Sequence, residues 1–163
     1  MTFLEKKPVT LIIYGSGGHK EQMKRLLALM KTHAEFDFVS ISDTKDNFNS
    51  LKHFECNEPR DKFSKWKAPF QLLKNAFTTS KQCIQITRNY KVTGLVSTGP
   101  GMVILPALIF KLLGKKVIFL ESWSRFYSRS LTGKVMYRIA DTFFVQNEDL
   151  LALYPNAIYS GRL

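Results

Sequence analysis

Short apolar runs rich in β-branched residues alternate along this chain with longer segments of helical periodicity, and this order constrains the fold most. The runs are too short for buried helices and predict strands at 9–14, 36–41, 92–97, 117–120 and 142–146, with weaker ones at 51–56 and 157–159. Between them, helices are predicted at 19–31, 65–89, 102–113, 131–140 and 148–154. This order is typical of an α/β fold, a Rossmann-like parallel sheet with helices on both faces. The 163 residues are enough for one such domain, which we expect to span 1–163.

Glycine-rich turns follow the first and fourth predicted strands. They consist of Gly15, Ser16, Gly17 and Gly18, and of Thr98, Gly99, Pro100 and Gly101. Ligands of parallel sheets bind beyond the carboxyl ends of the strands, which also directs attention to 121–125 and 146–147. Glycine lets the backbone approach a ligand, and a following helix attracts phosphate with its free N–H groups. Either turn alone could be plain loop geometry, but two at corresponding strand ends favour a phosphate-binding pocket.

Two side chains beside these turns are candidates for acid–base chemistry. His19 begins a helix next to the glycines, where the helix dipole favours the neutral imidazole that a general base needs. A capping or surface histidine is the alternative, and His33 and His53 are interpreted as surface residues. Glu121 follows an apolar strand and could act as a base, orient a hydroxyl or pair with Arg125. Arg125 and Arg129 could hold phosphate, or belong to a solvated loop.

The charge of the chain is strongly positive and uneven. Lys and Arg number 24 against 13 acids, a net charge of +11, and Glu121 is the only acid between residues 62 and 140. This excess indicates an anionic partner. Basic and aromatic residues at helical spacing predict a membrane-contacting surface, with core packing as the alternative, at Lys62, Phe63, Lys65, Trp66, Lys67, Phe70 and Lys74.

No secretory signal and no apolar run of about 18 residues are found, so we expect neither export nor a spanning helix. Cys56 and Cys83 lack the paired spacing of metal ligands and are predicted to be reduced cytosolic thiols. No cluster of carboxylates predicts a metal site.

Four segments resemble a known family. They are GSGGH at 15–19, STGPG at 97–101, LESWSRFYSRSLTGKVMYRIADTFFVQ at 120–146 and YPNAIYSGRL at 154–163. In this order they resemble the acceptor-binding subunit of the two-part N-acetylglucosaminyltransferase of asparagine-linked glycosylation, and equally its bacterial counterparts in capsule and exopolysaccharide synthesis. The third segment is far more specific than a glycine loop, whereas 43–89 adds little.

The resemblance implies the amino-terminal half of a B-type glycosyltransferase. Its reaction would move a sugar from a nucleotide sugar, expected to be a UDP-sugar bound by a separate donor-binding subunit, to a polyprenyl-diphosphate-linked sugar, without a metal or cofactor. His19 is then the first candidate for the base and Glu121 the second, with the glycine turns and Arg125 around the acceptor diphosphate. The carboxyl-terminal residues Tyr159, Gly161, Arg162 and Leu163 would dock the partner.

The resemblance also bears on location. Eukaryotic members usually begin with a membrane-spanning helix, and its absence here leads us to expect a bacterial protein, peripheral on the cytoplasmic face of the inner membrane. Donor sugar, acceptor sugar and linkage stay open.

Two other classes of function fit parts of the sequence. A non-catalytic basic module for RNA or another polyanion agrees with the charge, but the chain lacks a basic-aromatic sheet signature or helix-turn-helix pattern. A nucleotide-dependent oxidoreductase agrees with the first glycine turn, but Lys20 stands where the dinucleotide fingerprint needs its third glycine. Both rank below the glycosyltransferase, which would bind no nucleic acid.

Overall fold

The protein is built around one seven-stranded parallel sheet, seen here in a computed structural model that describes residues 7–56 and 68–163. The strand order is β3-β2-β1-β4-β5-β6-β7, and every neighbouring pair is parallel. The strands are β1 Pro8–Tyr14, β2 Asp37–Ser42, β3 Lys52–Glu55, β4 Lys91–Ser97, β5 Lys116–Leu120, β6 Thr142–Val145 and β7 Ile158–Tyr159. The order reverses between β1 and β4, which confirms the predicted position of the two glycine turns at a topological switch point.

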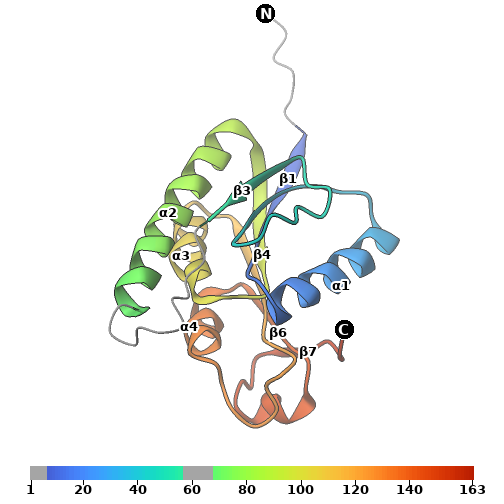
Figure 1. Ribbon diagram of the computed structural model, residues 1–163. Helices are drawn as coiled ribbons and strands as arrows, with labels where there is room; N and C mark the ends of the chain where they lie inside the picture. The colour runs from blue at the N-terminus through green and yellow to red at the C-terminus, as the bar shows by residue number, and fades with distance from the viewer. Residues whose placement is uncertain (1–6, 57–67) are drawn as a thin grey trace, which may run out of the picture.

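Helices cover both faces of the sheet, as predicted (Figure 1). The α-helices are α1 Gly18–His33, α2 Ala68–Asn89, α3 Ile104–Leu112 and α4 Leu131–Ile139, and the 3₁₀ helices are η1 Gly101–Val103 and η2 Glu148–Ala152. The α1 helix packs on one face, and α2, α3 and α4 pack side by side on the other (Figure 1). None of the helices in the described ranges has the length and apolarity to cross a bilayer.

The core consists of two layers, one on each face of the sheet. Along β1, Leu11 and Ile13 point into the larger layer under α2 to α4, whereas Ile12 and Tyr14 point toward α1. All four side chains are fully buried, because a central parallel strand is covered on both faces. This packing fixes the register of β1 and therefore the height at which its glycine turn leaves the sheet.

Three local predictions need correction. The helix expected at 102–113 begins with a turn of 3₁₀ helix, η1, and only then continues as α3. The helix expected at 148–154 is the short 3₁₀ helix η2, since Pro155 follows too soon for a second α-helical turn to form. His53 is only partly exposed and is not the free surface residue expected, because it pairs with Ser40 across β2 and β3 and its ring nitrogens lie 2.8 Å from Ser40 Oγ and from the Thr44 carbonyl oxygen.

Candidate functional site

The carboxyl ends of the central strands surround a pocket of about 310 Å³. The pocket brings together six of the residues predicted from the sequence, which lie after three different strands: His19, Thr98, Gly99, Pro100, Glu121 and Arg125. Ser122, Ser124, Ser130 and Thr132 add hydroxyl groups to its wall. A pocket of this size, with several convergent polar groups at a switch point, is typical of a ligand site.

His19 is held against the second glycine turn. The hydroxyl of Thr98 donates a hydrogen bond to the carbonyl oxygen of His19 at 3.0 Å. Gly99 has a φ of 99°, and a Cβ atom there would lie 2.8 Å from Cε1 of His19. Only glycine therefore accommodates both this backbone conformation and the imidazole beside it.

The two glycine turns touch each other. A Cβ atom at Gly15 would lie 2.6 Å from Cδ of Pro100, so the close approach of the turns requires a glycine there. Gly17 caps the amino terminus of α1 with a φ of 64°. Ser16 points elsewhere, since its hydroxyl donates to Asp43 Oδ2 at 3.2 Å.

The remaining glycines of the turns face the loop and helix that follow β5. A Cβ atom at Gly18 would lie 3.9 Å from Nε1 of Trp123, and one at Gly101 would lie 3.4 Å from Oγ1 of Thr132. The start of α1 thus lies beside the loop 122–130, and the second turn lies beside the start of α4. Of the residues predicted in the two turns, only Thr98, Gly99 and Pro100 line the pocket, whereas Gly15, Ser16, Gly17, Gly18 and Gly101 lie outside its lining.

Glu121 is buried at the base of the pocket, with 1% of its surface exposed. Its Oε1 accepts hydrogen bonds from the Ser122 backbone N–H and the Ser130 hydroxyl, both at 2.9 Å. Its Oε2 accepts one from the Tyr154 hydroxyl at 2.9 Å and lies 3.1 Å from Ser130 Oγ. Both oxygens are thus engaged, and in the part of the chain that the structure describes Glu121 forms no ion pair with Arg125, one of the predicted alternatives.

This carboxylate fixes the start of α4. Ser130 caps the helix by accepting a hydrogen bond from the Gly133 N–H at 2.7 Å while its hydroxyl donates to Glu121. A Cβ atom at Gly133 would lie only 1.8 Å from Oε2 of Glu121, so the contact requires glycine. Burial raises the pKa of Tyr154, and the nearby charge of Glu121 raises it further, which keeps this hydroxyl a donor.

The backbone of Glu121 is held as firmly as its side chain. Gln22 of α1 and Gln146 after β6 each donate an amide hydrogen bond to its carbonyl oxygen, at 3.1 Å and 3.0 Å. Asn147 donates to the carbonyl oxygens of Trp123 and Arg125 in the next loop. The fourth strand-end segment expected from the sequence, 146–147, therefore supports the site from behind and does not line it.

The predicted arginines lie in different places. Arg125 lines the pocket and is half-buried, and its guanidinium donates a hydrogen bond to the Ser128 hydroxyl at 3.4 Å. Arg129 does not line this pocket but lies on the outer side of α4. Within residues 7–56 and 68–163 no cluster of three His, Cys, Asp or Glu side chains could hold a metal ion.

The carboxyl-terminal residues cross back over the loop 122–130. Leu163 donates its N–H to Oε1 of Gln146 at 3.1 Å and accepts from the Arg25 guanidinium at 3.1 Å. The guanidinium of Arg162 lies 5.7 Å from the ring centre of Phe126. Gly161 has a φ of 72°, and Tyr159 ends the exposed edge strand β7. The predicted docking residues thus run from the sheet edge at β7 to Gln146, Arg25 and Phe126, which lie around the loop 122–130.

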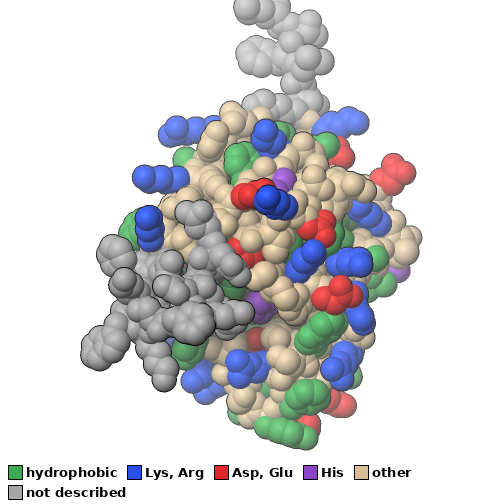
Figure 2. All heavy atoms as spheres, in the orientation of Figure 1, with side chains coloured by type: hydrophobic (Ala, Val, Ile, Leu, Met, Phe, Trp, Pro, Cys, Tyr) green, Lys and Arg blue, Asp and Glu red, His purple; other side chains and the backbone are tan. Residues whose placement is uncertain are grey.

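Most of the predicted membrane-contacting surface cannot be described. Lys62, Phe63, Lys65, Trp66 and Lys67, and the side chain of Phe70, lie outside the described residues, whereas Lys74 is exposed on α2. Further along the same helix, one stripe carries the exposed side chains Phe77, Lys81, Ile84 and Arg88. We call Lys74 and these four residues the α2 stripe. In Figure 2, Lys and Arg side chains lie along the left edge of the view, and the acidic side chains lie in the centre and on the right.

Sequence reasoning missed the residues that hold Glu121. Ser130 carries a signal in hindsight, because a serine directly before a helical segment is a typical N-cap. Tyr154, Gly133 and Gln22 carry none, since each acts only through contacts with residues far along the chain.

Comparison with known proteins identifies relatives over nearly the whole chain. Residues 10–163 match the family described as oligosaccharide biosynthesis protein Alg14 like. The chain is 27% identical to the UDP-N-acetylglucosamine transferase subunit ALG14 of Yarrowia lipolytica, covering 96% of this chain and 81% of that protein. It is 26% identical to the human protein of the same name, covering 94% and 82%.

Solved structures support the fold assignment. The chain superposes on the MurG of Acinetobacter baumannii with a TM-score of 0.60 at 17% identity, and on a UDP-N-acetylglucosamine 2-epimerase with a TM-score of 0.64 at 14% identity. These alignments cover 96% and 94% of this chain but only 44% and 46% of those proteins. The fold is therefore that of one half of a B-type glycosyltransferase, as predicted.

Proposed function

Because this chain belongs to the Alg14-like family of oligosaccharide biosynthesis proteins, we propose that it is the acceptor-binding subunit of a two-chain inverting glycosyltransferase. The reaction transfers a sugar from a UDP-sugar to a polyprenyl-diphosphate-linked sugar. The observation that carries this proposal is the position of His19 on the wall of a polar pocket, between two glycine turns at the switch point of the sheet.

His19 is the base in this proposal. It takes the proton from the acceptor hydroxyl as that oxygen attacks the anomeric carbon of the donor sugar. The new glycosidic bond forms while the bond from that carbon to the diphosphate oxygen breaks, and UDP leaves with the electron pair. Histidine suits this step because a side chain of this type can accept a proton and later release it near neutral pH.

Glu121 has a positioning role in this mechanism, although its residue type alone made it the second candidate for the base. A carboxylate that already accepts hydrogen bonds from Ser122, Ser130 and Tyr154 has no oxygen turned freely toward a substrate. Through Ser130 it fixes the start of α4, and through its backbone it fixes the wall that carries Arg125.

The acceptor diphosphate is assigned to the glycine turns. Gly17 and Gly18 support this assignment because they stand at the start of α1, a helix amino terminus without a side-chain cap. Gly99 lines the pocket, and Gly101 follows at the start of η1. Arg125 adds a planar cation to the lining of the pocket. Because helix dipoles and this cation provide the positive field, the proposal needs no metal or cofactor on this chain.

Membrane contact brings the lipid acceptor to the pocket. The α2 stripe combines three cations with Phe77 and Ile84, which are 61% and 39% exposed, and α2 contains no acidic residue. Such a surface binds anionic lipid through its charges and inserts its apolar side chains. We assign the protein to the cytoplasmic face of a bacterial inner membrane, as a peripheral protein of polysaccharide synthesis.

A separate donor-binding subunit completes the enzyme. The edge strand β7 leaves one row of backbone groups unpaired, and Ile158 and Tyr159 are 50% and 47% exposed beside it. The partner would dock on this edge and on the tail from Tyr159 to Leu163. Deleting Tyr159 to Leu163 should abolish copurification with the partner, and unchanged affinity would exclude this docking site.

The test of the function is a transfer assay on the assembled complex with His19→Ala. We expect at least a hundredfold loss of kcat with the fold and partner binding unchanged, since general base catalysis contributes about 10²–10⁴-fold. His33→Ala is the matched control, because His33 is exposed at the far end of α1. Near-normal turnover of the His19→Ala complex would remove this residue as the base.

A further inference from the structure

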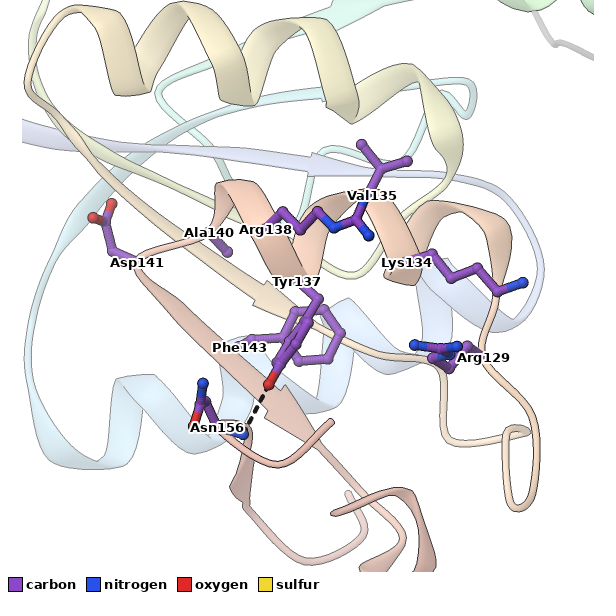
Figure 3. A pocket seen from close by; sticks show the side chains of 9 residues that line it. All are labelled: Arg129, Lys134, Val135, Tyr137, Arg138, Ala140, Asp141, Phe143 and Asn156. Atoms are coloured by element: carbon purple, nitrogen blue, oxygen red, sulfur yellow. Dashed lines mark hydrogen bonds between the residues drawn. The ribbon is translucent and has the colours of Figure 1, made fainter. Parts of the chain in front are cut away.

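A second groove lies beside α4, between this helix, Phe143 of β6 and Asn156, and its lining is distinct from that of the His19 pocket. Its volume is about 470 Å³, within the range of about 300–1,000 Å³ that is usual for small-molecule sites. Arg129 enters from the segment before α4, Lys134 and Arg138 come from the helix, and Asn156 closes the opposite side (Figure 3). The two pockets have no lining residue in common.

Three cations line this groove, and none of them forms an ion pair with a carboxylate among the described residues. Lys134 and Arg138 are one helical turn apart, so their side chains emerge on the same side of α4. The Arg129 guanidinium lies 6.0 Å from the ring centre of Tyr154, which orients it at the start of the groove. Like charges brought together without acidic partners indicate a site for an anion.

The one acid that lines the groove is engaged elsewhere. Asp141 forms a salt bridge with the Lys111 ammonium and accepts a hydrogen bond from the Val117 N–H at 2.9 Å. Its carboxylate points away from Tyr137 at the far end of α4 (Figure 3). The hydrogen bond from Lys111 holds the pKa of Asp141 below its usual range, and the same lysine compensates its charge. The three cations of the groove therefore have no local counter-charge.

The floor of the groove is rigid and aromatic. Tyr137 and Phe143 meet edge to face with ring centres 5.3 Å apart, and the Tyr137 hydroxyl accepts a hydrogen bond from the Asn156 N–H at 2.8 Å. Val135 adds a partly exposed apolar side chain at the rim. We propose that this groove is a second anion site, separate from the acceptor pocket, that binds a phosphoryl group carried by a lipid headgroup or a soluble phosphate ester.

Phosphate suits the site better than carboxylate because it carries more charge and more acceptor oxygens for two guanidinium groups and an ammonium. Backbone NMR shifts of Arg138, Ala140 and Asn156 report on the groove during titration with inorganic phosphate, glycerol 3-phosphate and glutarate. Cosedimentation with phosphatidylcholine vesicles, with and without phosphatidylglycerol, tests the lipid source.

The variants are Arg138→Gln and Lys134→Gln, both exposed positions where folding is not at risk, with Lys91→Gln as the control of equal charge change. A soluble ligand would be supported by saturable shifts with the soluble phosphates, if the affinity obtained from them falls at least about fivefold in the two groove variants and not in Lys91→Gln. Binding only to phosphatidylglycerol vesicles with the same variant pattern would support a lipid headgroup. The proposal would be overturned if Lys91→Gln lost as much affinity as the groove variants, or if glutarate bound as tightly as phosphate. It would also be overturned if neither the soluble phosphates nor the phosphatidylglycerol vesicles bound. His19→Ala should leave anion binding at the groove unchanged. A failure of the anion-site proposal can therefore be distinguished from a failure of the proposed transferase function.

Discussion

Removing the Tyr154 hydroxyl, which donates a hydrogen bond to Glu121 at the His19 pocket, should destabilise the protein measurably. In Tyr154→Phe, Oε2 of Glu121 loses its bond from the Tyr154 hydroxyl and keeps only Ser130, whose single proton is already directed to Oε1. Glu121 is 1% exposed, so water cannot replace the lost donor. A hydrogen bond to a buried charged group is worth about 1.5–3 kcal/mol, and we expect the free energy of unfolding to fall by about 2–3 kcal/mol.

Urea unfolding at 25 °C, followed by circular dichroism, measures this loss, and a thermal scan should show a midpoint lowered by about 4–12 °C. Tyr159→Phe is the matched control, since it removes the same hydroxyl at an exposed position and should change stability by less than about 0.5 kcal/mol. If Tyr154→Phe is as stable as this control, Glu121 is not anchored through Tyr154 and its assignment as a positioning residue loses its main support.

Three further predictions concern other parts of the molecule. Gly99→Ala should reduce transfer strongly, because a Cβ atom there displaces His19, and activity equal to wild type would show that the imidazole is not held by this contact. The lowered pKa of Asp141 stabilises the fold above the unfolded pKa of 3.8, so stability should fall as the pH drops below about 5, and less steeply in Asp141→Asn than in Asp149→Asn. Burial raises the pKa of Cys56 to about 12 and also raises that of Cys83, so neither thiol should react with a disulfide reagent before the protein unfolds.

The order of strands and helices could be predicted from the sequence because each element is indicated by residues close together along the chain. The β-branched run at 9–14 and the glycines that end it determine a strand and a turn within ten residues, and hydrophobic periodicity defines α1 directly after them. The position of the switch point then followed from the strand order. The type of a short element depends on more than its pattern: η2 has a helical pattern, but its five residues lie shortly before Pro155, which favours a 3₁₀ helix over an α-helix.

The candidate site could be located in the sequence only through residues whose type alone indicates a particular chemistry. His19 and the glycines could be selected because imidazole and a flexible backbone have few other uses at a strand end. The role of Glu121 could not be predicted, since a carboxylate after a strand is equally consistent with a base, an ion pair and an anchor. The contact that favours an anchor is the hydrogen bond from Tyr154, which is 33 residues away and meets Glu121 only in the folded protein.

The central claim is that this chain supplies the acceptor half of a two-chain transferase. The most direct measurement is sugar transfer to a polyprenyl-diphosphate-linked sugar, with a panel of UDP-sugars, by this chain alone, by its copurifying partner alone and by the two together. The account predicts transfer only with both chains and with one preferred donor. Full transfer by the partner alone, or tight salt-sensitive RNA binding by this chain with no transfer in any combination, would contradict it.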